Sequence, residues 1–403
     1  MNVLVVNAGS SSLKYQLFDT ETNEVKAKGL CERIGIDGRI IHKMPGKEDY
    51  VADLPMTNHS DATKILVNVL TDEETGCVRS MSEIEAVGHR VVHGGSYFSG
   101  SVLVTDEVVE KLKLCIDLAP LHTVPHLMGI QGCKDAMPNT PQVLVFDTAF
   151  HQTMPEKAYF YGVPYEMYEK YGIRRYGFHG TSHRYVSAEM LKLLDKPAEE
   201  TKIVTCHLGN GSSIAAVKGG KVMDTTMGFT PLDGLIMGTR CGAIDPAIVP
   251  FIMEKENMTA AEVNNYLNKK SGFLGVSGVS SDCRDLCAAA KEGNKRAALA
   301  IDMLGYQIKK YIGAYAAAMG GLDAIVFTAG IGENTAIIRE LACEELDFIG
   351  AVLDKDVNNN VPRPINTTCL STKDSRVKIY LIPTNEELVI ASDAAAIVKG
   401  LQK

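Results

Sequence analysis

Short apolar runs separated by turns of small residues open the chain. Residues 3–6 form a β-branched run, and two more runs follow at residues 15–18 and 25–31. Runs of this length between turn signals are typical of strands, so a β-meander is predicted. Its first turn, Asn-Ala-Gly-Ser-Ser-Ser-Leu-Lys at residues 7–14, is unusually rich in glycine and serine.

The same order of strand, glycine-rich turn and strand returns near residue 203. The second set has strands at residues 203–206, 214–217 and 222–225, with its turn at residues 208–213. Residues 208–212 can be laid over residues 8–12, an offset of 200 positions. This repeat predicts two copies of one domain type, and coincidence between two glycine-rich hairpins is the alternative.

The remaining pattern mixes helices and strands. Helical periodicity is predicted over residues 62–70, 106–118, 260–267, 285–291, 295–319 and 387–401. Buried strands are predicted over residues 87–92, 143–146, 324–327 and 378–382. The chain is therefore predicted to be an α/β protein.

Length and composition narrow the class of protein. The chain has 403 residues, beyond the roughly 250–300 at which one hydrophobic core stops growing, so two domains are expected. Apolar residues make up 45% and charged residues 22%, as in ordinary soluble globular proteins. The formal charge of −8 argues against a general nucleic-acid or anionic-membrane surface.

Ten cysteines raise the question of redox compartment. They are scattered, with no CxxC pair, which favours reduced thiols in the cytoplasm over a disulfide scaffold. The N-terminus enters a strand pattern at once, and no targeting signal or membrane span is visible.

Three glycine-rich turns each follow an apolar strand, at residues 7–14, 208–213 and 328–334. Glycine lets backbone N–H groups approach an anion, and serine hydroxyls add donors, so such turns suit polyphosphate. One such turn alone is more often plain turn chemistry. No GxxxxGK[ST] motif and no complete Rossmann glycine pattern is present, so neither a P-loop nor a dinucleotide site is supported.

Eight of the ten histidines lie between His89 and His207. A zinc site is disfavoured, because His122 and His126 lack the glutamate of an HExxH motif. His179 differs from the others because small residues surround it, which predicts that a ligand approaches the backbone there.

Three charged residues stand where a ligand could be held. Asp147 ends the strand at 143–146, and ligands of open α/β sheets collect at strand ends, although a capping role fits this segment equally well. Arg90 lies beside another strand, and Arg240 lies between glycines. Each arginine alone is more often a surface residue, but guanidinium groups match carboxylate and phosphate bidentately.

Taken together, these segments resemble the acetate kinase family over essentially the whole chain. The residues that carry the resemblance are 7–14, Arg90, 121–122, Asp147, 177–183, 207–212, Arg240, 282–284, 330–334 and Glu386. The resemblance implies two duplicated actin-like (ribonuclease H-like) α/β domains around a nucleotide cleft. It further implies a homodimer, a first domain of residues 1–149 plus the returning helix at 386–403, and a nucleotide-binding, dimer-forming domain of residues 150–385.

The resemblance also implies the roles of single residues. Asp147, His179 and Arg240 would be catalytic. The small acid would be bound by Arg90, Val92, Leu121, His122, Phe178 and Pro231. ATP would be bound by Ser10, Ser12, Lys14, His207, Leu208, Gly209, Asn210, Gly211, Asp282, Cys283, Arg284, Gly330, Ile331, Gly332, Glu333 and Asn334. Asn7 and Glu386 would help to hold Mg²⁺, with Mn²⁺ as a second possible metal.

The implied reaction is reversible transfer of the ATP γ-phosphate to acetate. Val92 favours acetate, and propionate kinase is the alternative of the same class. An actin-like or chaperone-type ATPase that drives a partner is the alternative of a different class. Cys283 stands where some members of the family have an aromatic residue, which leaves the adenine contact at this position open.

Overall fold

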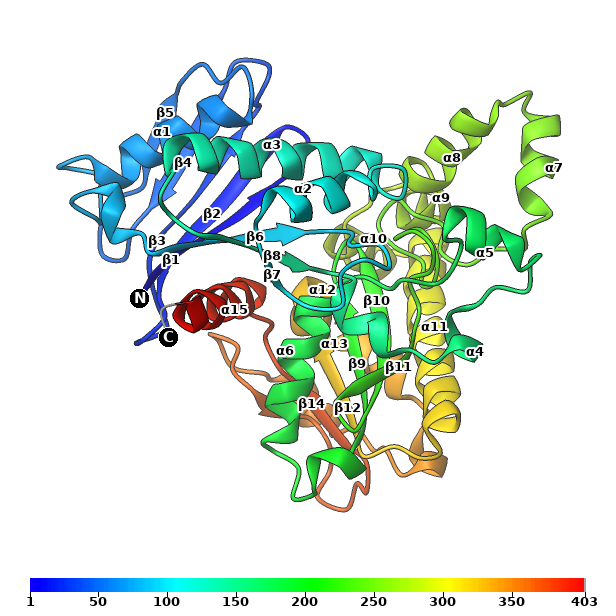
Figure 1. Cartoon of the computed structure of the whole chain (residues 1–403). Coiled ribbons are helices and arrows are strands. Elements are labelled where there is room, and N and C mark those ends of the chain that lie inside the picture. The colour runs from blue at the N-terminus through cyan, green and yellow to red at the C-terminus, as the bar shows by residue number, and fades with distance from the viewer. Residues whose placement is uncertain (402–403) are drawn as a thin grey trace. The chain divides into compact units, whose positions relative to one another are not determined.

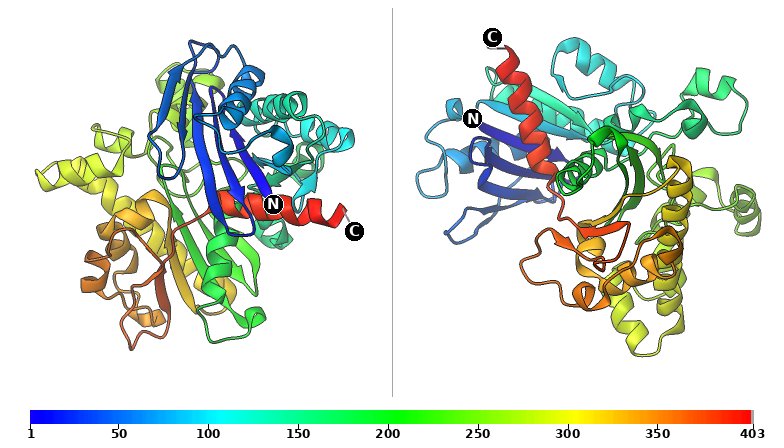
Figure 2. Two further views of the ribbon diagram at one scale, coloured as in Figure 1. Left: turned by 90° about the vertical axis from the view of Figure 1, so that its left-hand side faces the viewer. Right: turned by 90° about the horizontal axis from the view of Figure 1, so that it is seen from below.

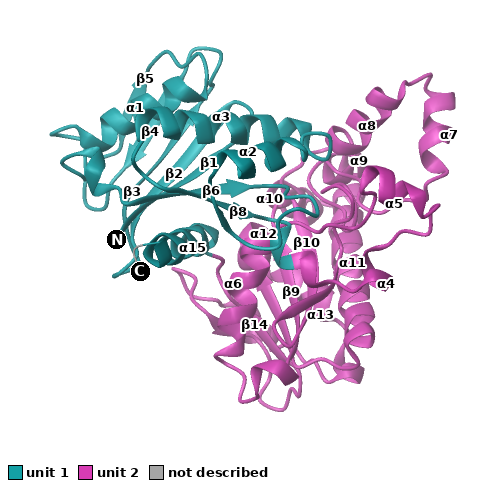
Figure 3. Cartoon of the chain, in the orientation of Figure 1, with its two compact units in different colours: residues 1–150, 385–403 teal, residues 151–384 magenta. Residues whose placement is uncertain are grey.

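A computed structural model describes residues 1–401, which form two compact units. Unit 1 comprises Met1–Phe150 and Asn385–Lys403, and unit 2 comprises His151–Thr384 (Figure 3). The boundaries expected from the sequence lie one residue away from each of these. The C-terminal helix thus returns to the unit in which the chain begins.

Unit 1 is built on an eight-stranded sheet of order β5-β4-β3-β2-β1-β6-β8-β7 (Figure 1). Its strands are β1 (Asn2–Ala8), β2 (Ser12–Asp19), β3 (Glu24–Glu32), β4 (Arg39–Lys43), β5 (Tyr50–Asp53), β6 (Ala86–Val91), β7 (Val102–Leu103) and β8 (Gln142–Phe146). Strands β1 to β5 form an antiparallel meander, and β6 and β8 run parallel to β1. The predicted meander is confirmed.

Helices cover both faces of this sheet. They are α1 (His59–Thr71), α2 (Asp106–Lys113), α3 (Pro120–Ala136) and α15 (Glu386–Leu401). The 3-10 turn η1 (Met81–Glu83) also belongs to unit 1, and η2 (Ala149–Thr153) crosses the boundary between the units. Alternate β1 side chains face opposite ways: Leu4 packs in the core beneath α1 and α3, and Val5 packs in the core beneath α15. Helix α15 packs against β6, β1 and β8, and Figure 2 shows it beside the N-terminal strand. Because both faces are buried, β1 reads as a continuous apolar run.

Helix α3 is absent from the sequence-based expectations, because Pro125, Gly129 and Gly132 interrupt its pattern. The glycines have a packing role: a Cβ at Gly129 would lie 2.9 Å from the Cβ of Ala8, and one at Gly132 would lie 2.9 Å from Thr63 Oγ1. The helix therefore approaches the first strand and α1 closely. The predicted helix over residues 106–118 is also corrected, since α2 ends at Lys113.

Unit 2 repeats the arrangement of unit 1. Its sheet has the order β11-β10-β9-β12-β14-β13, with β9 (Lys202–Leu208), β10 (Ser212–Lys218), β11 (Lys221–Thr225), β12 (Ala324–Thr328), β13 (Thr368–Cys369) and β14 (Lys378–Leu381). The series β11-β10-β9-β12-β14 corresponds to β3-β2-β1-β6-β8, with the same antiparallel and parallel pairings. The duplication predicted from the offset of the two turns is confirmed.

The helices of unit 2 surround that sheet. They are α4 (Glu156–Tyr159), α5 (Glu166–Tyr171), α6 (Gly180–Leu191), α7 (Ile248–Lys255), α8 (Ala260–Lys269), α9 (Gly272–Ser277), α10 (Cys283–Lys291), α11 (Lys295–Met319), α12 (Ala329–Asn334), α13 (Ala336–Cys343), α14 (Lys355–Asn359), η3 (Ala198–Glu200) and η4 (Asp347–Ile349). The 25-residue α11 has the predicted bounds and lies along the main core of the unit. No helix within residues 1–401 is both long and apolar enough to cross a membrane.

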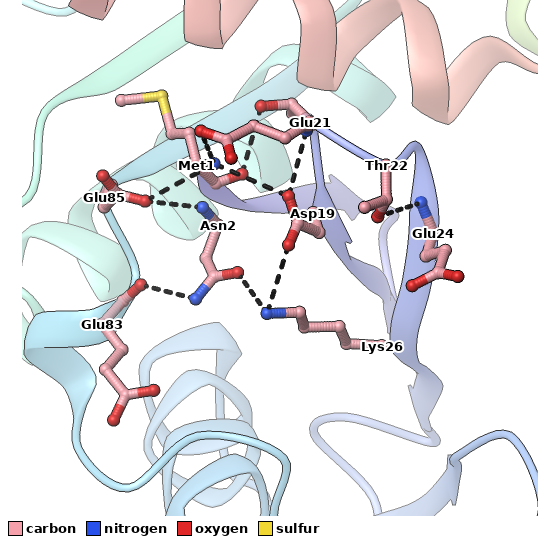
Figure 4. Close-up of polar contacts among 10 residues, drawn as sticks. Met1, Asn2, Asp19, Glu21, Thr22, Glu24, Lys26, Glu83 and Glu85 are labelled. Atoms are coloured by element: carbon pink, nitrogen blue, oxygen red, sulfur yellow. Dashed lines mark hydrogen bonds and ion pairs between the residues drawn. The ribbon is translucent and has the colours of Figure 1, made fainter.

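The N-terminus is tied to the start of the meander (Figure 4). The Met1 ammonium lies 3.6 Å from an Asp19 carboxylate oxygen and 3.3 Å from Glu21. Asn2 accepts from Lys26 Nζ at 2.7 Å and donates to the carbonyl of Glu83 at 3.0 Å. These contacts fix the beginning of β1, the strand that ends at the first glycine-rich turn.

Candidate active site

The first glycine-rich turn joins β1 to β2. Gly9 N–H donates to the carbonyl of Ser12 at 2.8 Å, and His59 Nε2 donates to the carbonyl of Gly9 at 2.6 Å. Asn7 stands opposite Lys14 across the hairpin. Ser10 and Lys14 are exposed and Ser12 is half-buried, so these side chains remain accessible to an anion.

Arg90 and Asp147 form a bidentate ion pair in unit 1. Arg90 Nε donates to Asp147 Oδ1 at 3.1 Å, and Nη2 donates to Oδ2 at 2.7 Å. Strands β6 and β8 are parallel, and Val91 at the end of β6 pairs with Phe146 at the end of β8. Arg90 is therefore close to Asp147, the residue that follows β8. The Asp147 side chain is 2% exposed and that of Arg90 is 23% exposed. The charge of Asp147 raises the pKa of Arg90, which therefore stays cationic.

Both members of this pair were expected at strand ends, but their pairing was not. Because Arg90 holds the Asp147 carboxylate with two donors, Asp147 is an acceptor that is already engaged. Arg90 keeps further N–H groups, and its partial exposure leaves them open to a second carboxylate. Glu386 Oε2 lies 3.9 Å from Arg90 Nε and adds a second negative charge beside it.

The residues expected to bind the small acid are divided between the units. Val92, Leu121 and His122 lie in unit 1 with Arg90, and Phe178 and Pro231 lie in unit 2. Val92 N–H donates to His126 Nε2 at 3.1 Å, which fixes the segment that follows β6. Leu121 is 75% exposed, and Phe178 is buried.

Asn7 and Glu386, the predicted metal ligands, offer oxygen donors. Asn7 lines a cavity of about 250 Å³ together with Lys14 and Glu387, and Glu386 begins the helix that carries Glu387. Among residues 1–401, no cluster of three or more His, Cys, Asp or Glu side chains forms a metal cage. Mg²⁺ prefers oxygen ligands and is usually bound by one or two side chains together with substrate phosphates. The amide and carboxylate oxygens of Asn7 and Glu386 fit that pattern.

His179 lies in the segment of small residues in unit 2 and has an unusual backbone conformation. It has φ 58°, in the left-handed region, and stands at the N-cap of α6. Its Nδ1 lies 2.9 Å from Ser213 Oγ, and its ring stacks on that of His207 with centroids 4.1 Å apart. This backbone strain and these contacts fix the direction of the ring.

Arg240 lies beside the second glycine-rich turn. Its Nη1 donates to the carbonyl of Pro231 at 3.0 Å, and burial lowers the pKa of the guanidinium. A Cβ built on Gly211 would lie 3.4 Å from Arg240 Nη1 and 3.6 Å from His179 Nε2. Because Gly211 has no side chain, the two donors face one small space beside its backbone.

The predicted nucleotide-binding residues converge on one cavity of about 730 Å³ in unit 2. Eight of them line it: Gly209, Asn210, Asp282, Cys283, Arg284, Gly330, Ile331 and Asn334. Residues 209 and 210 directly precede Gly211, so the turn leads from this cavity to the donors of His179 and Arg240.

Arg363 also lines this cavity and was missed by sequence reasoning. Its Nη1 donates to Asn334 Oδ1 at 2.6 Å, and Asn334 Nδ2 donates to the carbonyl of Gly330 at 2.8 Å. It comes from a loop with no motif, so no local signal marks it. Lys14, Ser10 and Ser12 belong to unit 1 and lie outside this cavity.

The third glycine-rich segment is a short helix and not a turn, which corrects the expectation for residues 328–334. The Glu333 side chain accepts from the backbone N–H of Ala329 at 2.9 Å and so satisfies a donor in the first turn of α12. The buried Arg339 donates to the carbonyls of Gly332 at 2.8 Å and Glu333 at 3.2 Å. Arg339 was also missed, and it holds this segment in place from beneath.

Comparison with known proteins identifies the family. The family model described as the acetokinase family matches residues 2–392. The acetate kinase of Halothermothrix orenii is 58% identical over 401 residues, which are 99% of this chain and 100% of that protein.

Two solved structures agree over nearly the whole chain. The Porphyromonas gingivalis acetate kinase has a TM-score of 0.94 at 48% identity and covers 98% of this chain and 99% of its own. The Francisella tularensis propionate kinase has a TM-score of 0.90 at 42% identity with the same coverage. The predicted fold of two actin-like α/β domains is thereby confirmed, and the chain belongs to the acetokinase family.

Proposed function

We propose that this enzyme is an acetate kinase, which transfers the γ-phosphate of ATP reversibly to acetate and gives acetyl phosphate and ADP. The observation that carries the proposal is the path of the turn at residues 209–211. Gly209 and Asn210 line the cavity of unit 2, and Gly211 faces the donors of His179 and Arg240. ATP in this cavity would direct its terminal phosphate to the place where those donors meet.

The donors match the demands of phosphoryl transfer. The transferring group carries charge on its equatorial oxygens, and catalysis depends mainly on positioning and on positive charge around them. Arg240 offers a fixed guanidinium, and His179 offers an imidazole N–H from a strained backbone position. We assign both residues to stabilisation of the phosphoryl group in transit.

The acid is held by the charged pair of unit 1. Acetate is already ionised near neutral pH, as the reference values of about 4 for carboxyl groups indicate, so it needs no strong base. Arg90 would bind the acetate carboxylate with the donors that Asp147 leaves open. Asp147 then serves to orient Arg90 and substrate, and it is not chiefly a proton acceptor.

The metal would be held by Asn7 and Glu386, directly or through water. Mg²⁺ supplies charge neutralisation for the β- and γ-phosphate oxygens when it is bound. Lys14, which is exposed on β2, would contact the polyphosphate, as would Ser10 and Ser12.

Substrate length is the finer part of the proposal. One methylene in an apolar pocket discriminates by only about 1–3 kcal/mol, and relatives named acetate kinase and propionate kinase share this fold. The relatives of higher identity are named acetate kinase. The Val92 side chain would narrow the pocket for the methyl group, so acetate is the proposed substrate.

Trapping the product tests the proposal. The purified enzyme with ATP, Mg²⁺ and hydroxylamine should give hydroxamate from acetate at a higher kcat/KM than from propionate or butyrate. A higher kcat/KM for propionate would identify propionate, and not acetate, as the substrate. Hydrolysis of ATP without trapped product would favour the partner-driving ATPase instead.

We also propose that the enzyme forms a homodimer through unit 2. Helix α7, Ile-Val-Pro-Phe-Ile-Met-Glu-Lys, is apolar but has no buried residue; Ile248 is 41% exposed and Phe251 is 60% exposed. An apolar surface of this kind marks an interaction site. Phe251→Asp should shift the sedimentation coefficient to that of a monomer, whereas the matched control Phe348→Asp, at a residue 76% exposed, should leave the dimer intact.

We also propose that the enzyme works in the cytoplasm. All ten cysteines are free thiols, and several are buried. Thiols persist in a reducing compartment, where ATP is also abundant. Alkylation of intact cells should find the exposed Cys369 as a thiol; a blocked Cys369 would argue against this location.

A further inference from the structure

A buried chain of hydrogen bonds leads from the interior of unit 2 to His179. His179 Nδ1 lies 2.9 Å from Ser213 Oγ, and the same oxygen lies 2.7 Å from His183 Nε2. His183 Nδ1 lies 2.7 Å from Thr205 Oγ1. Ser213, His183 and Thr205 are each 0% exposed. These hydrogen bonds join α6 to β9 and β10. Helix α6 packs against β9, and β9 pairs with β10 (Figure 1).

Proton counting restricts this chain to two directions. A serine hydroxyl has one proton, so Ser213 donates to one of its two histidines and accepts from the other. In the outward direction Thr205 donates to His183, His183 to Ser213, and Ser213 to His179 Nδ1. The proton of a neutral His179 is then on Nε2. In the inward direction every bond is reversed, and the proton of His179 is on Nδ1.

The ends of the chain favour the outward direction. If the bonds ran inward, the Thr205 hydroxyl would have to donate to the carbonyl of Ala215 at 3.5 Å, a poor hydrogen bond. If they run outward, Thr205 donates to His183 at 2.7 Å. Burial lowers the pKa of His183 well below its usual value, so His183 is neutral and has one proton to place.

The charges around His179 also matter. His207 stacks on His179 at 4.1 Å, His151 meets His183 edge to face at 5.7 Å, and Arg240 shares the space at Gly211. The Arg240 guanidinium thus adds positive charge close to the ring, which disfavours a second positive charge on His179. A neutral His179 that presents Nε2–H toward Gly211 is the state these surroundings favour.

We propose that Ser213, backed by His183 and Thr205, is a positioning residue that holds His179 as the neutral Nε2–H tautomer, ready to donate to the phosphoryl group. The inference rests on the proposed role of His179 in phosphoryl transfer. Ser213 itself touches no substrate. Its function is exerted through one hydrogen bond to Nδ1, which fixes both the tautomer and the ring orientation.

Nitrogen NMR on the intact enzyme tests the tautomer directly. With ¹⁵N-labelled histidine, and with His179→Gln and His183→Gln used for assignment, the His179 signals should show a protonated Nε2 and an unprotonated Nδ1 at pH 7.5 with ADP bound. His183 should show the same tautomer. Protonation of Nδ1, either as the other neutral tautomer or as imidazolium, would overturn the proposal.

A double-mutant cycle tests the function of the bond. Ser213→Ala should lower kcat by about 10- to 100-fold, the range expected for one buried hydrogen bond, with KM for ATP and acetate little changed. In a His179→Ala background the same substitution should cost nothing further, because its effect passes through His179. Ser213→Cys, with a weak donor of similar size, should recover part of the rate.

The outcomes separate this inference from the proposed function. If His179→Ala retains full kcat, the proposed role of His179 fails. If His179→Ala is impaired and Ser213→Ala lowers kcat equally in both backgrounds, only the inference fails. Ser187→Ala, a buried serine on α6 that donates to the Arg184 carbonyl at 3.1 Å, is the matched control and should keep wild-type kcat.

Discussion

Arg240 shows how one residue acquires a role from its surroundings. Its sequence position between glycines excludes a helix but does not say what the side chain faces. The structure brings its Nη1 to the same small space as His179 Nε2, with the carbonyl of Pro231 fixing the guanidinium at 3.0 Å. A partly buried, fixed cation of this kind is suited to charge that develops only in the transition state.

Replacing Arg240 with alanine should therefore lower kcat by about 10²–10⁵, the range for lost transition-state donors and arginine fingers, while KM for acetate changes little. Initial rates at saturating ATP would measure this. Arg33→Ala, at an exposed arginine paired with Asp37, is the matched control and should behave like the wild type. A loss confined to KM would contradict the assignment of Arg240.

The sequence predicted that Arg90 and Asp147 follow strands but could not pair them. Arg90 and Asp147 were each expected beside a strand, yet their two hydrogen bonds depend on the register of β6 with β8, which no local pattern records. Arg363 and Arg339 were missed for the same reason. Arg363 contacts Asn334 from 29 residues further along the chain, and Arg339 bonds the carbonyl of Gly332 from the next helix, α13.

At the level of elements, periodic segments were predictable and interrupted ones were not. Helix α11 has its expected bounds because 25 residues of regular apolar spacing leave no other choice. Helix α3 was missed because proline and glycines break its pattern, and their reason is tertiary: Gly129 lets α3 approach Ala8. Helix α12 was predicted to be a turn because its first turn depends on the hydrogen bond from the Ala329 N–H to the Glu333 side chain.

Two glycine substitutions should have opposite signs. Gly129→Ala would place a Cβ 2.9 Å from that of Ala8, and the overpacking should lower the free energy of unfolding by about 1–3 kcal/mol. Gly313→Ala, in α11 with nothing within 4 Å, should raise it by up to about 1 kcal/mol through helix propensity. Urea denaturation measures both. Stabilisation by Gly129→Ala would show that α3 does not press on the first strand.

At the scale of the whole molecule, the duplication of one domain type was predictable from two turns, because strand, turn and strand keep their phase over 200 residues (208 against 8). What the duplication does not predict is how the two copies have diverged. Unit 1 carries the Arg90–Asp147 pair at the end of its parallel strands, and unit 2 carries the cavity lined by the proposed nucleotide-binding residues.

Buried histidines should make unit 1 sensitive to acid. Burial lowers the pKa of His89 and His93 to about 4 and that of His126 to about 3, against about 6.5 in the unfolded chain. Between pH 6.5 and 4 the unfolded chain binds protons that the folded chain does not, so stability falls as the pH falls. Each such histidine contributes a slope of up to about 1.4 kcal/mol per pH unit.

Urea denaturation between pH 7.5 and 4.5 tests this prediction. The midpoint should fall steadily below pH 6.5, and His89→Gln should make the fall shallower. A midpoint that stays constant over this range would show that these histidines take up protons in the folded state.

The central claim is that a carboxylate oxygen of acetate becomes the bridging oxygen to the transferred γ-phosphorus. Acetate carrying ¹⁸O in both oxygens, incubated with ATP, Mg²⁺ and the enzyme, tests it by mass spectrometry of the acetyl phosphate formed. Attack by the acetate oxygen makes a bond from that oxygen to phosphorus and breaks no C–O bond of acetate, so it predicts a product that retains both ¹⁸O atoms. Loss of one label, or release of ADP without labelled acetyl phosphate, would contradict the account.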